Sequence, residues 1–483
     1  MEKLNSISFW LLLSLVIFTG CKRQESVGAQ TVEGERKTES QLNVSTEIEQ
    51  GDLWSRKSGL DWPTFLGPNG ESISSETGIL KDWTQGKLKL VWKIKTGAGY
   101  GMGSVVDGRF YHFGRINNKA TLLCLKAETG ETLWDFSYPS DYRDLYGYDS
   151  GPRASPVIDD GKVYIYGVEG HLHCLDAVSG EPLWDVQLNE KFGVIQNFFG
   201  VASTPVICKD LLLVMVGGSP DRSKRAAPGA LDEVEPDHTG LVALNKKTGK
   251  IIYQSINDLA SYSSLKLTQF NDQPVLLAWM RGSLFGVKPQ TGKVAFEFPW
   301  RSKKLESVNA SMPVVIDEHV LISECYEIGS ALLKLNPSSD SPELLDAEVV
   351  WNDKGKRDTA MMAHWNTPVV MGDLMFGCSG RHVANAELRC IDWKTGKVHW
   401  SETGLTRTSM LLIDGHLIVH AEDGKLFLIK ASKDKFELVT SYRDPAGVEF
   451  QQPCWAAPIV SHGLLFVRGR DTLACFDLIP TSE

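Results

Sequence analysis

The chain has 483 residues, of which 42% are hydrophobic and 23% are charged, and its 60 acidic and 50 basic residues give a formal net charge of −10. This apolar content is sufficient for a large folded core, which excludes disorder over most of the chain. There is no surplus of basic residues to neutralise a phosphate backbone, which argues against nucleic acid as a partner.

The first predicted element is an export signal. Residues 9–18 read FWLLLSLVIF, an apolar run of ten residues, whereas a membrane-spanning helix needs about 20. The run therefore predicts the core of a secretory signal. Thr19, Gly20 and Cys21 follow, and this order resembles a bacterial lipoprotein signal, which implies that residues 1–21 end at a lipidated Cys21. The alternative is an ordinary secretory signal with an unrelated cysteine.

Residues 22–60 are predicted to form a flexible tether, because they are rich in Glu, Gln, Ser, Thr and Lys and contain few aromatic residues. Lys22, directly after the cysteine, resembles the class of lipoproteins that are sorted to the outer membrane. We therefore expect an exported protein, periplasmic or on the cell surface, with a lipid anchor in the outer membrane.

Residues 61–483 are organised by an internal repeat. Residues 103–136 and 153–186 align as four short segments: a strand ending in Asp-Gly, a β-rich strand, a strand with Leu-x-Cys-Leu, and a Thr-Gly or Ser-Gly turn before a strand with Leu-Trp. Apolar residues alternate with a period of two, which is typical of strands, and Asp-Gly pairs favour tight hairpins. Four antiparallel strands in a meander form one blade of a β-propeller.

The repeat predicts eight blades. Five further units follow the first two, and an eighth unit stops after Ile479 without its fourth strand. Residues 88–96 carry the closing Trp92 without a unit before it. We expect this segment to complete the last blade beside residues 473–478. Residues 61–483 would then form an all-β, eight-bladed propeller of four-stranded antiparallel blades, closed by its N-terminal strand.

One copy of the repeat, CLDAVSGEPLW over residues 174–184, resembles the pyrroloquinoline-quinone-type (PQQ-like) repeat most fully. The turn precedes the Trp, whereas in WD repeats the turn follows the Trp-Asp pair. The resemblance covers nearly everything after the tether and implies the same propeller fold. The family contains quinoprotein dehydrogenases, and also non-enzymatic relatives such as the propeller lipoprotein of outer-membrane β-barrel assembly and uncharacterised exported bacterial proteins.

One face of the propeller is predicted to bind a ligand or partner. The loops between strands 2 and 3 and between consecutive blades share this face, and they are long, as binding loops on rigid scaffolds often are. Alignment of the residues just before the innermost strands predicts a rim around the central channel. This rim contains Met102, Arg153, Tyr262, Trp365, Arg407 and Trp455, with Tyr100, Asn309, His364 and Gln451 beside it.

Two arginines and three aromatic rings in that rim are suited to a carboxylate-bearing ligand, through forked hydrogen bonds and stacking. The alternative is that the rings fill the channel while the arginines pair with loop acids such as Asp149. Both interpretations place the same side chains at the mouth of the channel.

The sequence favours a non-catalytic role. Quinoprotein alcohol dehydrogenases carry an adjacent cysteine pair, which this sequence lacks, and oxygen ligands for Ca²⁺ beside a carboxylate base. In the loops that feed the rim of units five and six, Glu306 and Asp358 are the acids. We therefore expect no catalytic residue, no metal and no cofactor, in a lipid-anchored scaffold that binds an envelope protein, peptide or glycan. The alternative is a PQQ- and Ca²⁺-dependent dehydrogenase of alcohols or sugars.

Overall fold

The computed structural model describes residues 51–195, 198–219, 228–443 and 447–480. The predicted signal, its Cys21 and most of the predicted tether lie outside the described residues. All described residues belong to one compact unit. Among them, no helix has both the length and the apolar character that crossing a membrane requires.

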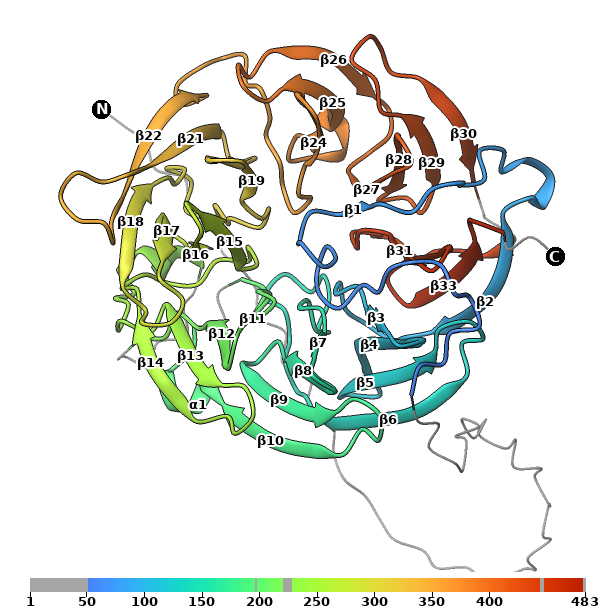
Figure 1. The fold of residues 1–483 in the computed structure, drawn as a ribbon, viewed down its shortest axis with the longest axis horizontal. Coiled ribbons are helices and arrows are strands. Elements are labelled where there is room, and N and C mark those ends of the chain that lie inside the picture. Colours follow the sequence, from blue (N-terminus) through green and yellow to red (C-terminus); the bar gives the residue numbers. More distant parts are fainter. Residues whose placement is uncertain (1–50, 196–197, 220–227, 444–446, 481–483) are drawn as a thin grey trace, which may run out of the picture. The chain divides into compact units, whose positions relative to one another are not determined.

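The described strands form eight sheets arranged around a central axis, which confirms the eight-bladed propeller (Figure 1). Seven sheets have four strands and one has five. The bounds in blades 1 to 4 are β3 (Ser104–Val106), β4 (Arg109–Ile116), β5 (Lys119–Lys126), β6 (Thr132–Pro139); β7 (Val157–Asp159), β8 (Lys162–Tyr166), β9 (His171–Asp176), β10 (Pro182–Gln187); β11 (Val206–Cys208), β12 (Leu211–Met215), β13 (Leu241–Asn245), β14 (Ile251–Ser255); β15 (Lys266–Phe270), β16 (Gln273–Trp279), β17 (Ser283–Val287) and β18 (Val294–Pro299).

Blades 5 to 8 continue the same order. Their strands are β19 (Val314–Ile316), β20 (His319–Glu324), β21 (Gly329–Pro337), β22 (Leu345–Asn352); β23 (Val369–Met371), β24 (Leu374–Ser379), β25 (Glu387–Asp392), β26 (Val398–Thr403); β27 (Thr408–Ile413), β28 (His416–Ala421), β29 (Leu426–Lys430), β30 (Leu438–Tyr442); β31 (Ile459–Ser461), β32 (Leu464–Arg468) and β33 (Thr472–Asp477). Short helical turns are η1 (Thr84–Gly86), α1 (Leu188–Phe192), η2 (Pro228–Glu233) and η3 (Val383–Asn385).

The N-terminal strand closes the ring as predicted. Strand β2 (Lys89–Lys95) pairs antiparallel with β33, and Trp92 lies opposite Cys475 while Ile94 lies opposite Leu473. Both members of the first pair are buried in a hydrophobic cluster that joins the last blade to its neighbours. The N-terminal strand is therefore held to the last blade by a complete β-ladder, and side-chain packing joins the last blade to the first.

The closing aromatic residue of one blade bonds to the next blade. Trp92 Nε1 donates to the carbonyl oxygen of Ala127 at 2.9 Å, and Trp400 Nε1 donates to that of Ser432 at 2.9 Å. The glycine of the Thr-Gly turn packs under the ring: a Cβ on Gly130 would lie 2.7 Å from the Trp92 indole, and the residue has φ of +74°. Only glycine fits this conformation and this contact. The repeat thus specifies the joint between blades as well as each blade.

Every outermost strand contains a β-bulge directly before its closing position. The pairing register shifts there in all eight blades, which leaves one extra residue on the outer strand. A bulge bends the strand and increases its twist. The extra residues are Val91, Leu133, Leu183, Ile252, Ala295, Val350, His399 and Val439.

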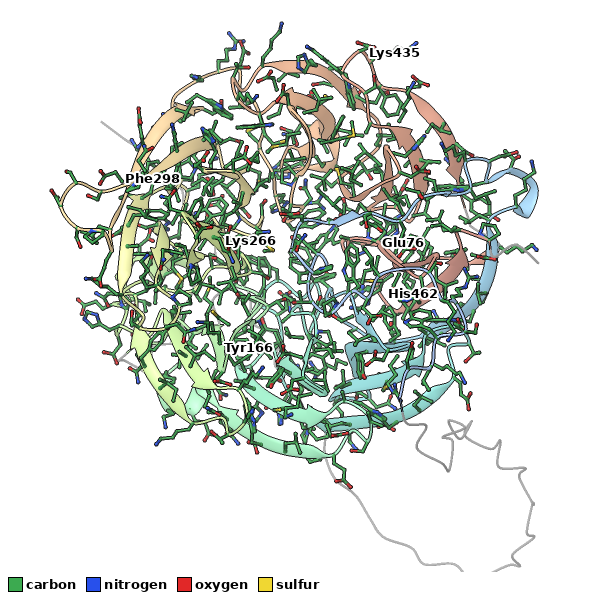
Figure 2. The ribbon with its side chains drawn as sticks, in the orientation of Figure 1. Glu76, Tyr166, Lys266, Phe298, Lys435 and His462 are labelled. Carbon is green, nitrogen blue, oxygen red and sulfur yellow. The ribbon has the colours of Figure 1, made fainter. Side chains whose placement is uncertain are left out.

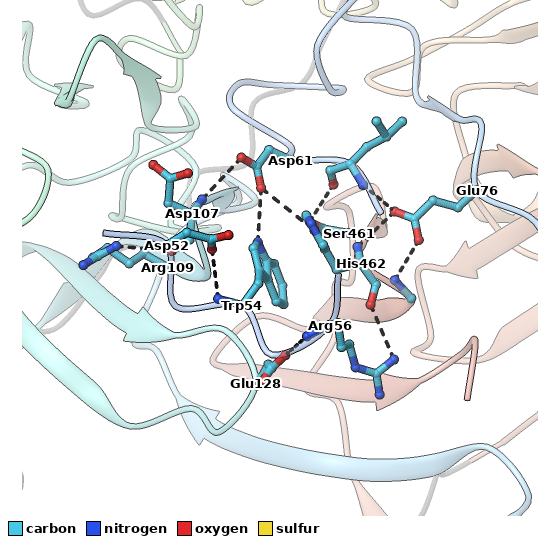
Figure 3. A network of polar contacts seen from close by, with 12 residues as sticks. Asp52, Trp54, Arg56, Asp61, Glu76, Asp107, Arg109, Glu128, Ser461 and His462 are labelled. Atoms are coloured by element: carbon cyan, nitrogen blue, oxygen red, sulfur yellow. Dashed lines mark hydrogen bonds and ion pairs between the residues drawn. The ribbon is translucent and has the colours of Figure 1, made fainter. Parts of the chain in front are cut away.

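Residues 51–86 are here called the strap. Trp54, Arg56, Asp61 and Glu76 of the strap lie beside the turn of the last blade that contains Ser461 and His462 (Figure 3). The Trp54 indole stacks on the His462 ring with centroids 4.1 Å apart. Arg56 forms a 2.8 Å ion pair with Asp477. The Glu76 carboxylate accepts a 2.9 Å hydrogen bond from the backbone N–H of His462. These contacts fasten the N-terminal segment to the blade that its own strand β2 completes.

The strap then crosses the central channel, which the sequence did not predict. Strand β1 (Ile73–Ser74) pairs parallel with β27 and adds a fifth strand to blade 7, with Ile73 opposite Leu412. On the way, the Pro63 carbonyl accepts a 2.9 Å bond from Ile158 N in blade 2. In blade 4, Lys266 donates to the Asn69 carbonyl, and Figure 2 shows this lysine near the centre of the ring. The blades thus surround a channel that the strap blocks.

Candidate functional site

A cavity of about 650 Å³ opens on the long-loop face of the propeller. Its walls come from the loops that connect strands 2 and 3 within blades and from the loops between blades. Eight of the predicted rim residues line it: Tyr100, Met102, Arg153, Tyr262, His364, Trp365, Arg407 and Trp455. Each of them lies just before an innermost strand, so the eightfold fold brings side chains that are distant in sequence around one axis.

Two predicted residues lie elsewhere. Asn309 is buried, and its side-chain amide donates to the Met280 carbonyl at 2.7 Å. Gln451 is exposed and is not among the lining residues. Sequence reasoning placed them one and four residues before a rim position, and neither lines the cavity.

Three of the lining aromatic residues form a row. The ring centroids of Tyr100 and Trp455 are 4.6 Å apart, and those of Trp455 and Trp365 are also 4.6 Å apart, with interplanar angles of 38° and 36°. Offset and tilted pairs of this kind are favourable arrangements of aromatic side chains. The row gives one wall of the cavity an extended apolar surface.

Three arginines line the cavity, and each lies against an aromatic ring. Arg407 lies 4.6 Å from the Trp365 centroid, and Arg381 lies 4.5 Å from that of Tyr326. Arg153 lies 5.4 Å from the Tyr100 centroid. These separations are within the range of cation–π attraction.

Each of these arginines also has a carboxylate partner. Arg153 pairs with buried Asp144 at 3.1 Å, and Arg381 pairs with Glu306 at 3.2 Å. Arg407 Nε donates to Glu422 Oε2 at 2.7 Å. Asp149, which the sequence offered as an example of an acid that pairs with the rim arginines, accepts a hydrogen bond from Arg153 through its backbone carbonyl. The formal charge of the three arginines is therefore balanced by three acids.

Several polar atoms of the lining residues have no partner within the described protein. They are the hydroxyl of Tyr100, Nε1 of Trp365 and Nδ1 of His364. Burial, together with Arg407 and Arg381, lowers the pKa of His364 to about 3, so its ring is neutral near pH 7. Buried donors and acceptors are rarely left unsatisfied, and these three atoms are themselves buried, below the surface of the cavity wall.

Other lining residues were missed by sequence reasoning. Tyr146, Tyr148, Phe198 and Phe199 come from loops that the sequence marked as long, but their inward direction has no signal in the repeat. Tyr326, Arg381 and His382 come from the loops between strands 2 and 3. Phe65 and Leu66 of the strap form the inner end of the cavity.

The acids in this region do not form a metal site. Glu306 lines the cavity, whereas Asp358 does not. In the ranges that the structure describes, no group of three His, Cys, Asp or Glu side chains is placed to hold a metal ion. The carboxylates nearest the cavity are instead paired with arginines, as described above.

Comparison with known proteins agrees with the repeat and the fold. Residues 118–339 match the family described as "Outer membrane protein assembly factor BamB". The crystal structure of BamB from Moraxella catarrhalis has a similar fold, with a TM-score of 0.54 and 12% identity, over 81% of this chain and 100% of that chain. The chain is therefore a β-propeller protein built from PQQ-like repeats.

The curated relatives are dehydrogenase subunits. The chain is 29% identical over 166 residues to a protein of Gluconobacter oxydans named "Alcohol dehydrogenase (quinone), dehydrogenase subunit", which covers 33% of this chain and 21% of that protein. It is 24% identical over 290 residues to the subunit of the same name from Komagataeibacter europaeus, which covers 49% of this chain and 38% of that protein. The chain thus spans well under half the length of these relatives.

These relatives overturn part of the sequence-based interpretation. The expectations of a non-catalytic scaffold, of no enzymatic activity and of no cofactor are wrong, because the curated proteins that the chain matches are named as subunits of quinone-dependent alcohol dehydrogenases. The physical reason for the error is that the interpretation depended only on the absent cysteine pair and the scattered acids. The cavity that the loops form could not be seen in the sequence. The alternative interpretation is favoured instead.

Proposed function

We propose that the protein is an oxidoreductase of the quinoprotein type, and that its central cavity binds a planar quinone such as PQQ and an alcohol substrate. The row of Tyr100, Trp455 and Trp365 supports this proposal, because a flat, conjugated ligand gains most from an extended aromatic wall. The similarity to the quinone-dependent dehydrogenase subunits supports the reaction class.

The lining residues fit a quinone that carries carboxylates. Trp365 and Trp455, which line the cavity, would stack on its rings. Arg381, whose side chain is 29% exposed, would bind a carboxylate in competition with Glu306. When bound, such a quinone accepts the two electrons that leave the alcohol carbon.

Glu306 supplies the carboxylate of the cavity wall. A backbone hydrogen bond, and then Arg381, lower its pKa, so the side chain is ionised near pH 7. Its side chain is 44% exposed and reaches solvent at the mouth. We assign to its carboxylate oxygens the task of accepting the hydroxyl proton of the alcohol, as general bases do.

The residues do not fit a metal ion held by several protein carboxylates, because the described part of the cavity brings no three metal-binding side chains together. No step of the proposed reaction is therefore assigned to a metal.

We place this activity in the cell envelope, on the strength of the export signal in residues 9–18 and of the anchoring role proposed for Cys21. The reduced cofactor would need an electron acceptor, so the partner on the long-loop face is proposed to be an envelope protein or a soluble redox carrier. Because the relatives are much longer than the aligned segments, further parts of their activity are not transferred to this chain.

A direct test is titration of the purified protein with PQQ in the presence of Ca²⁺, in which quenching of tryptophan fluorescence measures binding. A separate assay then measures dye-linked oxidation of primary alcohols and sugars. We expect saturable binding and substrate-dependent dye reduction. Arg381→Gln should weaken PQQ binding about tenfold, the size of a lost charge-assisted hydrogen bond. Arg357→Gln, an exposed arginine outside the cavity, is the matched control. Binding without turnover would refute the enzymatic proposal, and absence of binding would refute the quinone site.

A further inference from the structure

The cavity has a floor that does not belong to the propeller repeat. Phe65 and Leu66, both in the strap, line its inner end. A second cavity of about 440 Å³ lies on the other side of the strap, and Phe65 lines that one too. Thr204 and Ser264 of the inner channel wall are also common to both cavities. The Phe65 ring therefore stands where the two spaces would otherwise join into one channel.

The strap is fixed to the inner strands on several sides of this floor. The backbones of Trp62 and Val105 exchange hydrogen bonds of 2.7 and 2.8 Å in blade 1. Across the channel, Ser72 Oγ donates to the Met410 carbonyl of blade 7 at 2.7 Å. With the bonds to Ile158 and to Lys266 described above, four blades hold the segment. The floor is thus anchored around its edge.

The backbone at the floor is strained. Leu66 has φ of +60° although it is not a glycine, and it is 6% exposed. Its carbonyl accepts hydrogen bonds from the N–H groups of Glu71 and Ser72, at 2.9 and 2.8 Å. Such conformations persist only where the surroundings over-determine them, and they are common at ligand sites. The adjoining Gly67, with φ of +87°, lies so close to Trp62 that a Cβ would be 3.0 Å from the indole.

We propose that the strap is part of the binding site: Phe65 and Leu66 contact the inner end of the ligand and determine how deeply it lies. This inference rests on the proposed function in so far as it concerns the same cavity. It makes the site a blind pocket with one mouth, on the long-loop face. It also means that the depth of the pocket is specified by a segment outside the eight repeats.

The test compares substitutions within the strap, using two probes of the full-length protein: PQQ and the dye 8-anilinonaphthalene-1-sulfonate. Phe65→Ala should weaken binding of both probes about tenfold, the size of one lost aromatic contact. Phe65→Leu, which keeps an apolar floor of similar shape, should restore affinity to within about threefold of the wild type. Ile73→Ala is the matched control, because Ile73 packs against the blade core and lines neither cavity.

Unfolding midpoints of Phe65→Ala and Ile73→Ala, measured in urea, separate loss of the site from loss of the fold. If Phe65→Ala leaves both affinities within twofold while Trp365→Ala lowers them, the ligand does not reach the floor and the inference is wrong. If the dye binds and Phe65→Ala weakens its binding, while PQQ does not bind, the proposed function is wrong but the role of Phe65 in the binding site is supported. If neither probe binds the wild-type protein, the inference fails together with the site.

Discussion

The carboxylate of Glu422 holds the guanidinium of Arg407 in place at the mouth of the cavity, with Nε and Oε2 2.7 Å apart. The same carboxylate accepts a 3.0 Å hydrogen bond from Trp455 Nε1. One acidic side chain from blade 7 therefore positions a cation and an aromatic ring that come from different blades. This relationship makes the ligand-facing wall dependent on a residue that does not line the cavity.

Removal of this carboxylate should be costly. Glu422→Ala would leave Arg407, whose side chain is 17% exposed, without its charged partner, and such changes destabilise proteins by about 3 kcal/mol. Glu437→Ala removes the partner of Lys430 from an exposed pair, 3.7 Å apart, and should cost about 0.5 kcal/mol or less. Urea unfolding of the two variants measures the difference; equal losses would contradict the role given to Glu422.

The closure strand offers a second prediction, based on Trp92. Trp92→Phe keeps an aromatic ring but loses the indole donor to the Ala127 carbonyl, and should lower the free energy of unfolding by about 1 kcal/mol. Trp92→Ala also empties the core between the last and first blades, with a loss of about 3–5 kcal/mol. The measurement is the urea midpoint of each variant. A Trp92→Ala protein as stable as the Phe variant would show that the Trp92 side chain does not stabilise this joint.

Glu324 should make stability depend on pH. Burial raises its pKa from 4.5 to about 7, and one carboxylate oxygen has no hydrogen-bond partner among the described residues. The folded state therefore binds more protons than the unfolded state between these values, and stability from this group falls as the pH rises from 4.5 through 7. Glu324→Gln mimics the protonated form, so its stability relative to the wild type should rise over that window, by at most about 3 kcal/mol.

Unfolding curves of Glu324→Gln and wild type at pH 5 and pH 8 provide the comparison. The buried histidines titrate in both proteins, so their contribution cancels in the difference. A difference that does not change between the two pH values would show that Glu324 has the same charge in the folded and unfolded states.

The anchor is tested by Cys21→Ser. We expect the wild-type protein in the membrane fraction, because acyl chains buried in a bilayer contribute roughly 0.8 kcal/mol per CH₂ group. The serine variant should move to the soluble fraction of the exported material. Unchanged fractionation would mean that Cys21 carries no lipid and that an ordinary secretory signal precedes the mature chain.

The repeat made most of the fold predictable. The segment around Trp92 has no repeat unit before it, and the eighth unit has no last strand. One pairing between these two segments completes the ring, and the structure contains it. The same register placed Arg153, Trp365 and Trp455 around one cavity, because equivalent positions of a cyclic fold face the same axis. Asn309 could not be placed this way, since neighbouring residues near a strand point to opposite sides.

The floor of the cavity was beyond the reach of sequence reasoning. Phe65 belongs to a segment without repeat partners, and its position depends on hydrogen bonds with blades that are far away in sequence. Strand β1 has only two residues, too few for any periodic pattern. Arg381 and Phe199 likewise lie in loops, and the conformation of a loop cannot be predicted from an alternation of apolar residues. The chemistry of the site was misjudged for the same reason, because it depends on these loops.

The bulges of the outer strands have a consequence for neighbouring molecules. The extra residues include Leu183, Ile252 and Val350, which are 48%, 51% and 46% exposed. The outer edge of the propeller therefore presents apolar side chains on strands whose outward backbone groups have no partner strand in the described part of the chain. Regular edge strands of that composition would form β-sheet pairs between neighbouring molecules. The bulge in each outermost strand interrupts the regular spacing of backbone donors and acceptors that pairing between molecules requires. Neighbouring molecules can therefore touch at their outer edges and still separate.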